Sequence, residues 1–234
     1  MAEQVGLARN FTLDWLDTAA DCQMLGKDKA EAHEYLDSII SQTIQSKDNI
    51  RKTRTIMLNL WYGNEPWIMH ESIEACRYAA RSERLPLHWA LLLAYYPVFF
   101  DLCSVIGSLL EYRDTVTLQQ IKSRIYEKWG ARTTLEHSLS KNMQSLKDVG
   151  AMIPQQAAGA YTAANYTVDS KRIVYVLADS ILKNEQREYM TWEEIIHHPA
   201  LFPFSIVNVT QADLASCERF SLERMGDDVV IRRR

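Results

Sequence analysis

A run of hydroxyl, amide, imidazole and cationic side chains lies in the middle of the chain, on the predicted outward face of one helix. Counting about 100° per residue from Leu135, these side chains point away from an apolar stripe on the same helix. They are Thr134, His137, Ser138, Lys141, Gln144 and Ser145, with Thr133 directly before them. Side chains of these types hydrogen-bond to phosphate oxygens and to base edges in the major groove. The pattern therefore predicts a face that binds double-stranded DNA.

Three further cations, Lys122, Arg124 and Arg132, flank this face, and we expect them to contact phosphates. Residues 115–172 contain eight Lys or Arg against four Asp or Glu, a net charge of +4, whereas residues 1–114 carry −5 and residues 173–234 carry −3. A positive segment on an acidic chain suits a protein that binds the phosphate backbone. Because a net charge of +4 is modest, we expect weak and salt-sensitive affinity.

Two helices joined by a short turn must position these residues. The first apolar stripe runs through residues 118–129, with Thr117 as its N-cap and Gly130 at its end. The second stripe runs through residues 135–146 and begins only a few residues later. Two stripes joined by so short a turn pack on each other at a steep angle, which is the geometry of a helix-turn-helix.

A hairpin is expected directly after the second helix. Ala151–Pro154 would form its first strand and Tyr166–Val168 its return strand, while Gln155–Asn165, which is small, polar and contains Gly159, would form a mobile wing. This order of parts over residues 115–168 resembles the winged helix-turn-helix superfamily. The resemblance implies a module that binds nucleic acid or, as the alternative, another protein.

Four features of the chain share a second resemblance. They are the opening segment VGLARNFTLDWL, a helix with a basic IRKTR run, an apolar middle, and the helix-to-strand exit SLKDVGAMI. Together they resemble the small accessory DNA-binding protein A family of bacterial BREX phage-defence systems. The resemblance implies a cytoplasmic bacterial protein that binds duplex DNA without catalysis, with other subunits of a defence complex as further partners.

The remaining elements give the expected fold class. Six helices are predicted in residues 1–114, and the apolar stretch 85–110 is read as two buried helices broken at Pro97 rather than as a membrane span. Residues 171–234 should hold an amphipathic helix, a short capped helix, an apolar LFPF anchor and a hairpin. We therefore expect a mostly α protein with three parts: an N-terminal helical bundle (1–114), a winged helix-turn-helix (115–170) and a small α/β C-terminal subdomain (171–234).

Two other basic clusters each have two interpretations. Lys47, Arg51, Lys52 and Arg54 form either a solvated helix face or a second phosphate contact, and the second role requires their helix to lie beside the helix-turn-helix. The run Ile231–Arg234 is expected to be a frayed, solvated tail rather than a nucleic-acid arm.

An enzyme is not indicated by any motif. A Gly-rich phosphate loop, a Gly-x-Ser-x-Gly elbow and an HExxH pair are all missing from the sequence. The adjacent pairs Glu193-Glu194, His197-His198 and Asp227-Asp228 point to different faces and are unsuited to sharing a proton or a metal. We therefore expect no catalytic residue, no metal and no cofactor.

Cysteine usage favours a reducing compartment. The four cysteines are far apart, without the paired spacing of a disulfide framework or zinc site, and are expected to be buried thiols. The opening residues lack the apolar core of a secretion signal. We expect a cytoplasmic protein with no membrane partner, and no heptad seam predicts its oligomeric state.

Overall fold

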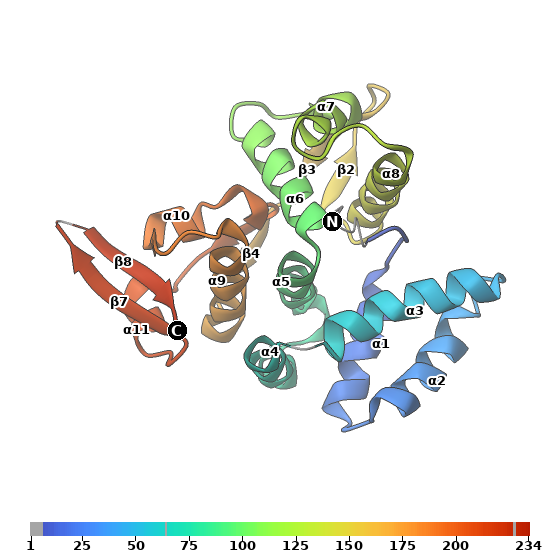
Figure 1. Cartoon of the computed structure of the whole chain (residues 1–234), viewed down its shortest axis with the longest axis horizontal. Helices are drawn as coiled ribbons and strands as arrows, with labels where there is room; N and C mark the ends of the chain where they lie inside the picture. The colour runs from blue at the N-terminus through green and yellow to red at the C-terminus, as the bar shows by residue number, and fades with distance from the viewer. Residues whose placement is uncertain (1–6, 64, 227) are drawn as a thin grey trace.

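The chain folds mainly into helices. A computed structural model describes residues 7–63, 65–226 and 228–234, and within them it contains eleven α-helices and eight short strands (Figure 1). The mostly α fold class is therefore confirmed. Some residues used in the sequence analysis lie outside the described residues. They are residues 1–6, which include the start of the VGLARNFTLDWL segment, and Asp227 of the Asp227-Asp228 pair.

Helix α5 (Leu85–Tyr95) lies at the centre, and residues 85–94 are all buried. It contacts α3 (Lys47–Trp61), α4 (Pro66–Tyr78), α6 (Pro97–Leu110) and α9 (Lys171–Glu185). The sequence predicts this burial, because a helix that is apolar on all sides must be covered on all sides.

The chain bends sharply between α5 and α6. The bend is 118°, and Pro97 begins α6 at a position where its missing N–H costs no helical hydrogen bond. The prediction of two helices broken at Pro97 is confirmed. No single helix in the described ranges is long and apolar enough to cross a membrane, and the bent α5–α6 pair meets that test only by the combined length and composition of its two helices.

Local capping fixes where the first helices begin. Helix α1 (Leu13–Met24) is capped by Thr12, α2 (Lys29–Ile40) by Asp28, and α3 by Ser46, in each case through a side-chain oxygen that accepts a backbone N–H. Helix α4 ends at Tyr78, and a separate 3₁₀ turn, η1 (Arg81–Glu83), follows it.

A three-stranded sheet and two helices form in mid-chain. Strand β1 (Val116–Thr117) leads into α7 (Leu118–Trp129), and α8 (Thr133–Asp148) leads into β2 (Met152–Pro154) and β3 (Ala160–Ala163). Strand β3 pairs antiparallel with both others, which gives the order β1-β3-β2. The predicted cap at Thr117 and stop at Gly130 are both present.

The predicted return strand of the hairpin was wrong. Ala160–Ala163 returns beside β2, whereas Tyr166–Val168 forms β4 and pairs parallel with β6 (Phe204–Ile206). The connecting loop is therefore residues 155–159, closed by Gly159 at φ +72°. Alanine is depleted in strands and β-branched residues are enriched, so local preference favoured Tyr166–Val168 although long-range pairing selects β3.

The C-terminal elements form a further three-stranded sheet. Its order is β5-β8-β7, made by Met190–Thr191, Asp228–Arg233 and Phe220–Met225, respectively. Two short helices, α10 (Trp192–Ile196) and α11 (Gln211–Ala215), and the 3₁₀ turn η2 (Pro199–Leu201) complete this part. The LFPF anchor docks as expected: the rings of Phe202 and Phe204 pack edge-on against Trp89 of α5.

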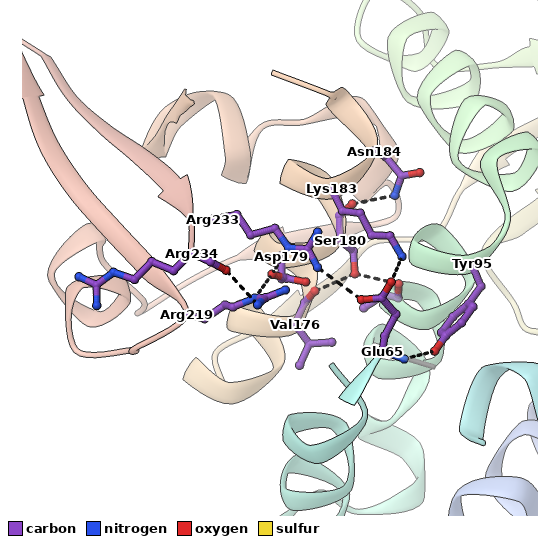
Figure 2. A network of polar contacts seen from close by, with 11 residues as sticks. Glu65, Tyr95, Val176, Asp179, Ser180, Lys183, Asn184, Arg219, Arg233 and Arg234 are labelled. Carbon is purple, nitrogen blue, oxygen red and sulfur yellow. Dashed lines mark hydrogen bonds and ion pairs between the residues drawn. The ribbon is translucent and has the colours of Figure 1, made fainter. Parts of the chain in front are cut away.

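A buried carboxylate ties this sheet to the helices (Figure 2). Asp179 of α9 is fully buried, and one of its oxygens accepts from Nε of Arg219 at 2.6 Å and from Nε of Arg233 at 2.8 Å. Arg233 also reaches Glu65 at the start of α4, which pairs with Lys183 of α9 at 2.7 Å. The expectation of a frayed tail at Ile231–Arg234 was wrong, because β8 includes residues up to Arg233, and the guanidinium of Arg233 pairs with the buried Asp179 and with the partly exposed Glu65.

Replacing Asp179 should be strongly destabilising. We expect Asp179→Asn to lower the free energy of unfolding by about 3 kcal/mol, since two guanidinium groups lose their shared partner. The matched control is Glu193→Gln, which removes an exposed carboxylate and should change stability by less than about 0.5 kcal/mol. Equal denaturant midpoints for the two variants would contradict a stabilising role for this network.

Two histidines are buried as neutral rings. His88 of α5 is fully buried between Trp61 and Asp17; its Nδ1 accepts from the indole N–H, which leaves Nε2–H to donate to the carboxylate at 3.0 Å. His198 accepts the backbone N–H of Ala200 and contacts Glu185. Burial lowers the pKa of both imidazoles, although each carboxylate opposes the shift.

Stability should therefore fall in mild acid. Because the pKa of each ring is lower in the folded than in the unfolded state, unfolding takes up protons as the pH drops below about 7. We expect the free energy of unfolding to decrease toward pH 5 by at most about 1.4 kcal/mol per pH unit for each ring. Denaturant titrations should show a shallower slope for His198→Gln and an unchanged slope for the exposed-ring control His197→Gln.

Candidate nucleic-acid interface

Helix α8 divides into a buried face and an exposed face. Its buried residues are Leu135, Ser138, Leu139, Asn142, Met143, Ser145 and Leu146. In Figure 1 the helix lies at one side of the group formed by α6, α7, β2 and β3, with the start of the chain passing next to it. One side of α8 is thus available to a ligand, as the sequence predicts.

Most of the predicted contact residues lie on the exposed side. Thr133, Thr134, His137 and Lys141 are exposed, and Gln144 is half-buried. Gln144 donates to Asp148 one turn later at 2.7 Å, so these two side chains at the C-terminal end of the exposed face are hydrogen-bonded to each other. Residues 133–141 of α8 therefore carry the exposed hydroxyl, imidazole and ammonium groups.

The prediction that Ser138 and Ser145 point outward was wrong. Both are fully buried: the Ser138 hydroxyl donates to the carbonyl of Leu7 at 2.6 Å, and the Ser145 hydroxyl accepts from the N–H of Phe11 at 2.8 Å. Asn142 also donates to the Leu7 carbonyl, at 3.2 Å. These side chains lie on the flank of the apolar stripe, where an extended segment of backbone needs hydrogen-bond partners. They position α8 rather than face a ligand.

Two of the three predicted phosphate-binding cations form ion pairs with carboxylates. Lys122 of α7 pairs with Glu136 of α8 at 2.9 Å, a contact that raises the pKa of Lys122 and lowers that of Glu136. Arg124 pairs with Glu127 at 3.3 Å on an exposed helix turn, where such pairs contribute little. Arg132, at the N-cap of α8, is half-buried, and its Nε is a buried donor that has no hydrogen-bond partner among the described residues.

Two residues of the exposed face were missed. Ser140 is exposed and Lys147 is half-buried. The count of about 100° per residue places both on the flank of the apolar stripe, on the side away from Ser138 and Ser145. Lys147 adds a cation to the last turn of the helix.

Helix α3, which carries the basic cluster, lies across a groove from α8. Arg51 and Lys52 both pair with Asp48, at 2.8 and 2.5 Å, and Arg54 pairs with Asp37. A groove of about 830 Å³ separates the first turns of α3 from α8, with Asn49 lining one bank and Lys141 the other. Helix α3 therefore lies beside α8, but the four cations of the cluster are not among the residues that line the groove, and the second phosphate contact stays a prediction.

The described residues contain no group of three or more His, Cys, Asp or Glu side chains that could hold a metal ion. Cys22, Cys76 and Cys103 are buried thiols as expected, while Cys217 is half-buried. Burial raises the pKa of Cys76 to about 12, which keeps this thiol protonated.

Removing a buried hydroxyl of α8 should lower the free energy of unfolding, whereas removing an exposed one should not. We expect Ser145→Ala to cost about 1–3 kcal/mol, because the buried N–H of Phe11 loses its acceptor. The control on the same helix is the exposed Ser140→Ala, which should stay within about 0.5 kcal/mol of the parent. Thermal melts of equal midpoint for both variants would show that the Phe11 contact does not stabilise the fold.

No protein-family model matches the chain, and neither the curated proteins nor the solved structures contain a significant match.

Proposed function

We propose that this chain is a non-enzymatic, DNA-binding protein that uses a winged helix-turn-helix on duplex DNA. In the proposal α8 enters the major groove, with Thr134, His137 and Lys141 nearest the bases. Arg132 and the loop between β2 and β3 lie against the phosphate backbone. The resemblance to BREX accessory proteins further suggests an accessory factor of a bacterial phage-defence system, or a regulator.

The order of elements supports the proposal. A leading helix, a short strand, two helices and a hairpin follow one another as α6-β1-α7-α8-β2-β3, with the returning strand in the middle of the sheet. This arrangement is typical of winged helix-turn-helix modules. The observation that carries the argument is the exposed half of α8, whose residues 133–141 present hydrogen-bonding and cationic groups, followed along the chain by the β2–β3 loop of residues 155–159.

The alternative is a protein-interaction adaptor, and one observation favours it. Two apolar side chains beside the turn of the β7–β8 hairpin are exposed to solvent: Met225 is 43% exposed and Val229 is 38% exposed. The LFPF segment is a poor candidate for this role, because Leu201 and Phe204 are buried. An apolar docking surface responds weakly to salt, whereas phosphate binding makes log affinity fall linearly with log salt.

Charge reversal on the exposed face should abolish binding. We expect Lys141→Glu to weaken binding of a fluorescent duplex of about 20 base pairs by at least about tenfold in anisotropy titrations, because a phosphate contact becomes a repulsion. The melting temperature should stay near that of the parent, since Lys141 is exposed. The matched control is Lys29→Glu, an equal change at the start of α2. Undiminished binding by Lys141→Glu would exclude α8 as the contact helix.

A further inference from the structure

We propose that the outer edge of strand β4 binds an extended segment of a partner protein that carries Lys or Arg side chains. The binding surface is the β4 groove, which is lined by residues 165–170 together with the end of α4, η1 and the starts of α5 and α9. This inference does not rest on the proposed function, because no residue of the exposed face of α8 lines the groove.

Strand β4 has one paired edge and one free edge. The N–H of Tyr166 donates to the carbonyl of Pro203 at 2.9 Å, and the carbonyl of Val168 accepts from the N–H of Val207 at 3.0 Å, so both residues face β6. Backbone groups of successive strand residues point to opposite edges, so the N–H and carbonyl of Thr167 point away from β6. Among the described residues these two groups have no backbone partner, and β6 is the only strand beside β4. Such an edge is a template for a further strand.

The free edge lies in a groove rather than on an open surface. The groove has a volume of about 690 Å³, and six consecutive residues, 165–170, line it, so β4 borders it along its whole length. Helices α4 and α9, which supply other lining residues, pack side by side (Figure 1). Because an extended chain advances about 3.3 Å per residue, a segment of about five or six residues can lie along this edge.

The groove offers both apolar and aromatic contacts. Leu85, Pro86 and Ile173 contribute apolar surface, while the side chains of Tyr78 and Tyr166 are 82% and 38% exposed. The face of a tyrosine ring attracts the cation of Lys or Arg. The side chains of an added strand alternate between its two faces, so an occupant with alternating apolar and cationic residues can use both kinds of contact.

The charges of the lining favour a cationic occupant. The charged lining residues are Glu83, Asp169 and Arg172. The guanidinium of Arg172 is already paired with Glu71 at 2.7 Å, whereas no cation of the described residues lies within 4.0 Å of the carboxylate of Glu83 or Asp169. Both acids are exposed, so two negative charges are left for a ligand. The groove therefore attracts Lys or Arg side chains and repels a phosphate backbone.

The first experiment tests the backbone contact. The probes are fluorescein-labelled hexapeptides with blocked ends, in which Lys alternates with Val, Ile, Leu or Tyr. Thr167→Pro removes the outward N–H and keeps the hydrogen bonds to β6, because proline is tolerated where the N–H of an edge strand faces solvent. The matched control is Thr167→Val, which keeps the N–H and the β-branched shape and loses only the hydroxyl group. Thermal melts verify the folding of both variants before the anisotropy titrations.

We expect peptides of this panel to bind the parent and Thr167→Val equally, and to bind Thr167→Pro at least about tenfold more weakly. N-methylation of alternate residues blocks one edge of a peptide strand. One of the two alternating methylation patterns should therefore abolish binding to the parent, and the other should preserve it. A parent that binds no peptide of the panel, parental affinity of Thr167→Pro, or equal effects of the two methylation patterns would overturn the proposal.

The second experiment tests the charge contact. Glu83→Gln/Asp169→Asn should weaken peptide binding by about tenfold and reduce its dependence on salt, because the cationic side chains lose both carboxylates. Glutamine at position 83 can still accept the N–H of Ala80, as Glu83 does at 2.9 Å. The control Glu34→Gln/Glu193→Gln removes two exposed acids from α2 and α10 and should bind like the parent. Equal affinities of the two double variants would contradict recognition by charge.

Hydrogen exchange reports the position of the peptide directly. Saturation with peptide should slow exchange of the Thr167 amide at least about tenfold, because its N–H becomes part of a ladder. The Tyr166 amide, which already donates to Pro203, should change little. Unchanged exchange at Thr167 in the saturated protein would place the peptide elsewhere and overturn the proposal.

The groove and the face of α8 are separated by exchanging their ligands. Lys141→Glu should bind the peptides like the parent, and Thr167→Pro should bind the duplex of about 20 base pairs like the parent. Loss of duplex binding by Thr167→Pro would assign the groove to DNA and overturn the peptide proposal. A parent that binds peptide but not duplex DNA would overturn the proposed function alone.

Discussion

Helix α5 imposes the constraint on which the other elements depend. It has no polar face, so it gains stability only when helices cover it on every side. Elements from distant parts of the sequence meet on it: α3 and α4 from before it, α6 directly after it, and α9 from more than 70 residues later. The polar ring of His88 can lie in this apolar helix because both of its nitrogens form hydrogen bonds, one with Trp61 and one with Asp17. The apolar helix thus determines the arrangement of the rest.

Helix α8 is held by two kinds of contact that leave one side free. Apolar residues such as Leu139 and Leu146 bury it against the mid-chain helices and sheet, while Ser138, Asn142 and Ser145 bind the backbone of the segment that contains Leu7 and Phe11. Polar contacts are directional, so they fix the rotation of the helix about its axis more strictly than apolar packing does. The remaining side chains, including His137 and Lys141, are therefore presented in a defined orientation.

Local rules made most elements predictable from the sequence. Thr12, Asp28, Thr117 and Thr191 cap the helices that follow them, and Gly130 ends α7, because each of these effects involves residues only a few positions apart. The errors all concern partners distant in sequence. Ser145 pairs with a residue 134 positions earlier, β4 pairs with β6 rather than with β2, and Arg233 reaches a buried carboxylate 54 positions away. Helical periodicity gives the side of a helix on which a residue lies, but not which distant segment covers that side.

The arginine pair on Asp179 has a consequence for how the chain is made. Arg219 and Arg233 follow Asp179 by 40 and 54 residues, so a ribosome adding about 5–20 residues per second needs roughly 3–10 seconds to supply both of them. During that interval the carboxylate of α9 lacks its compensating charges, and the apolar side of α9 has no completed sheet to cover it. The charge-compensated burial of Asp179 therefore cannot form until Arg219 and Arg233 have both been added, so this part of the fold is completed only late in synthesis.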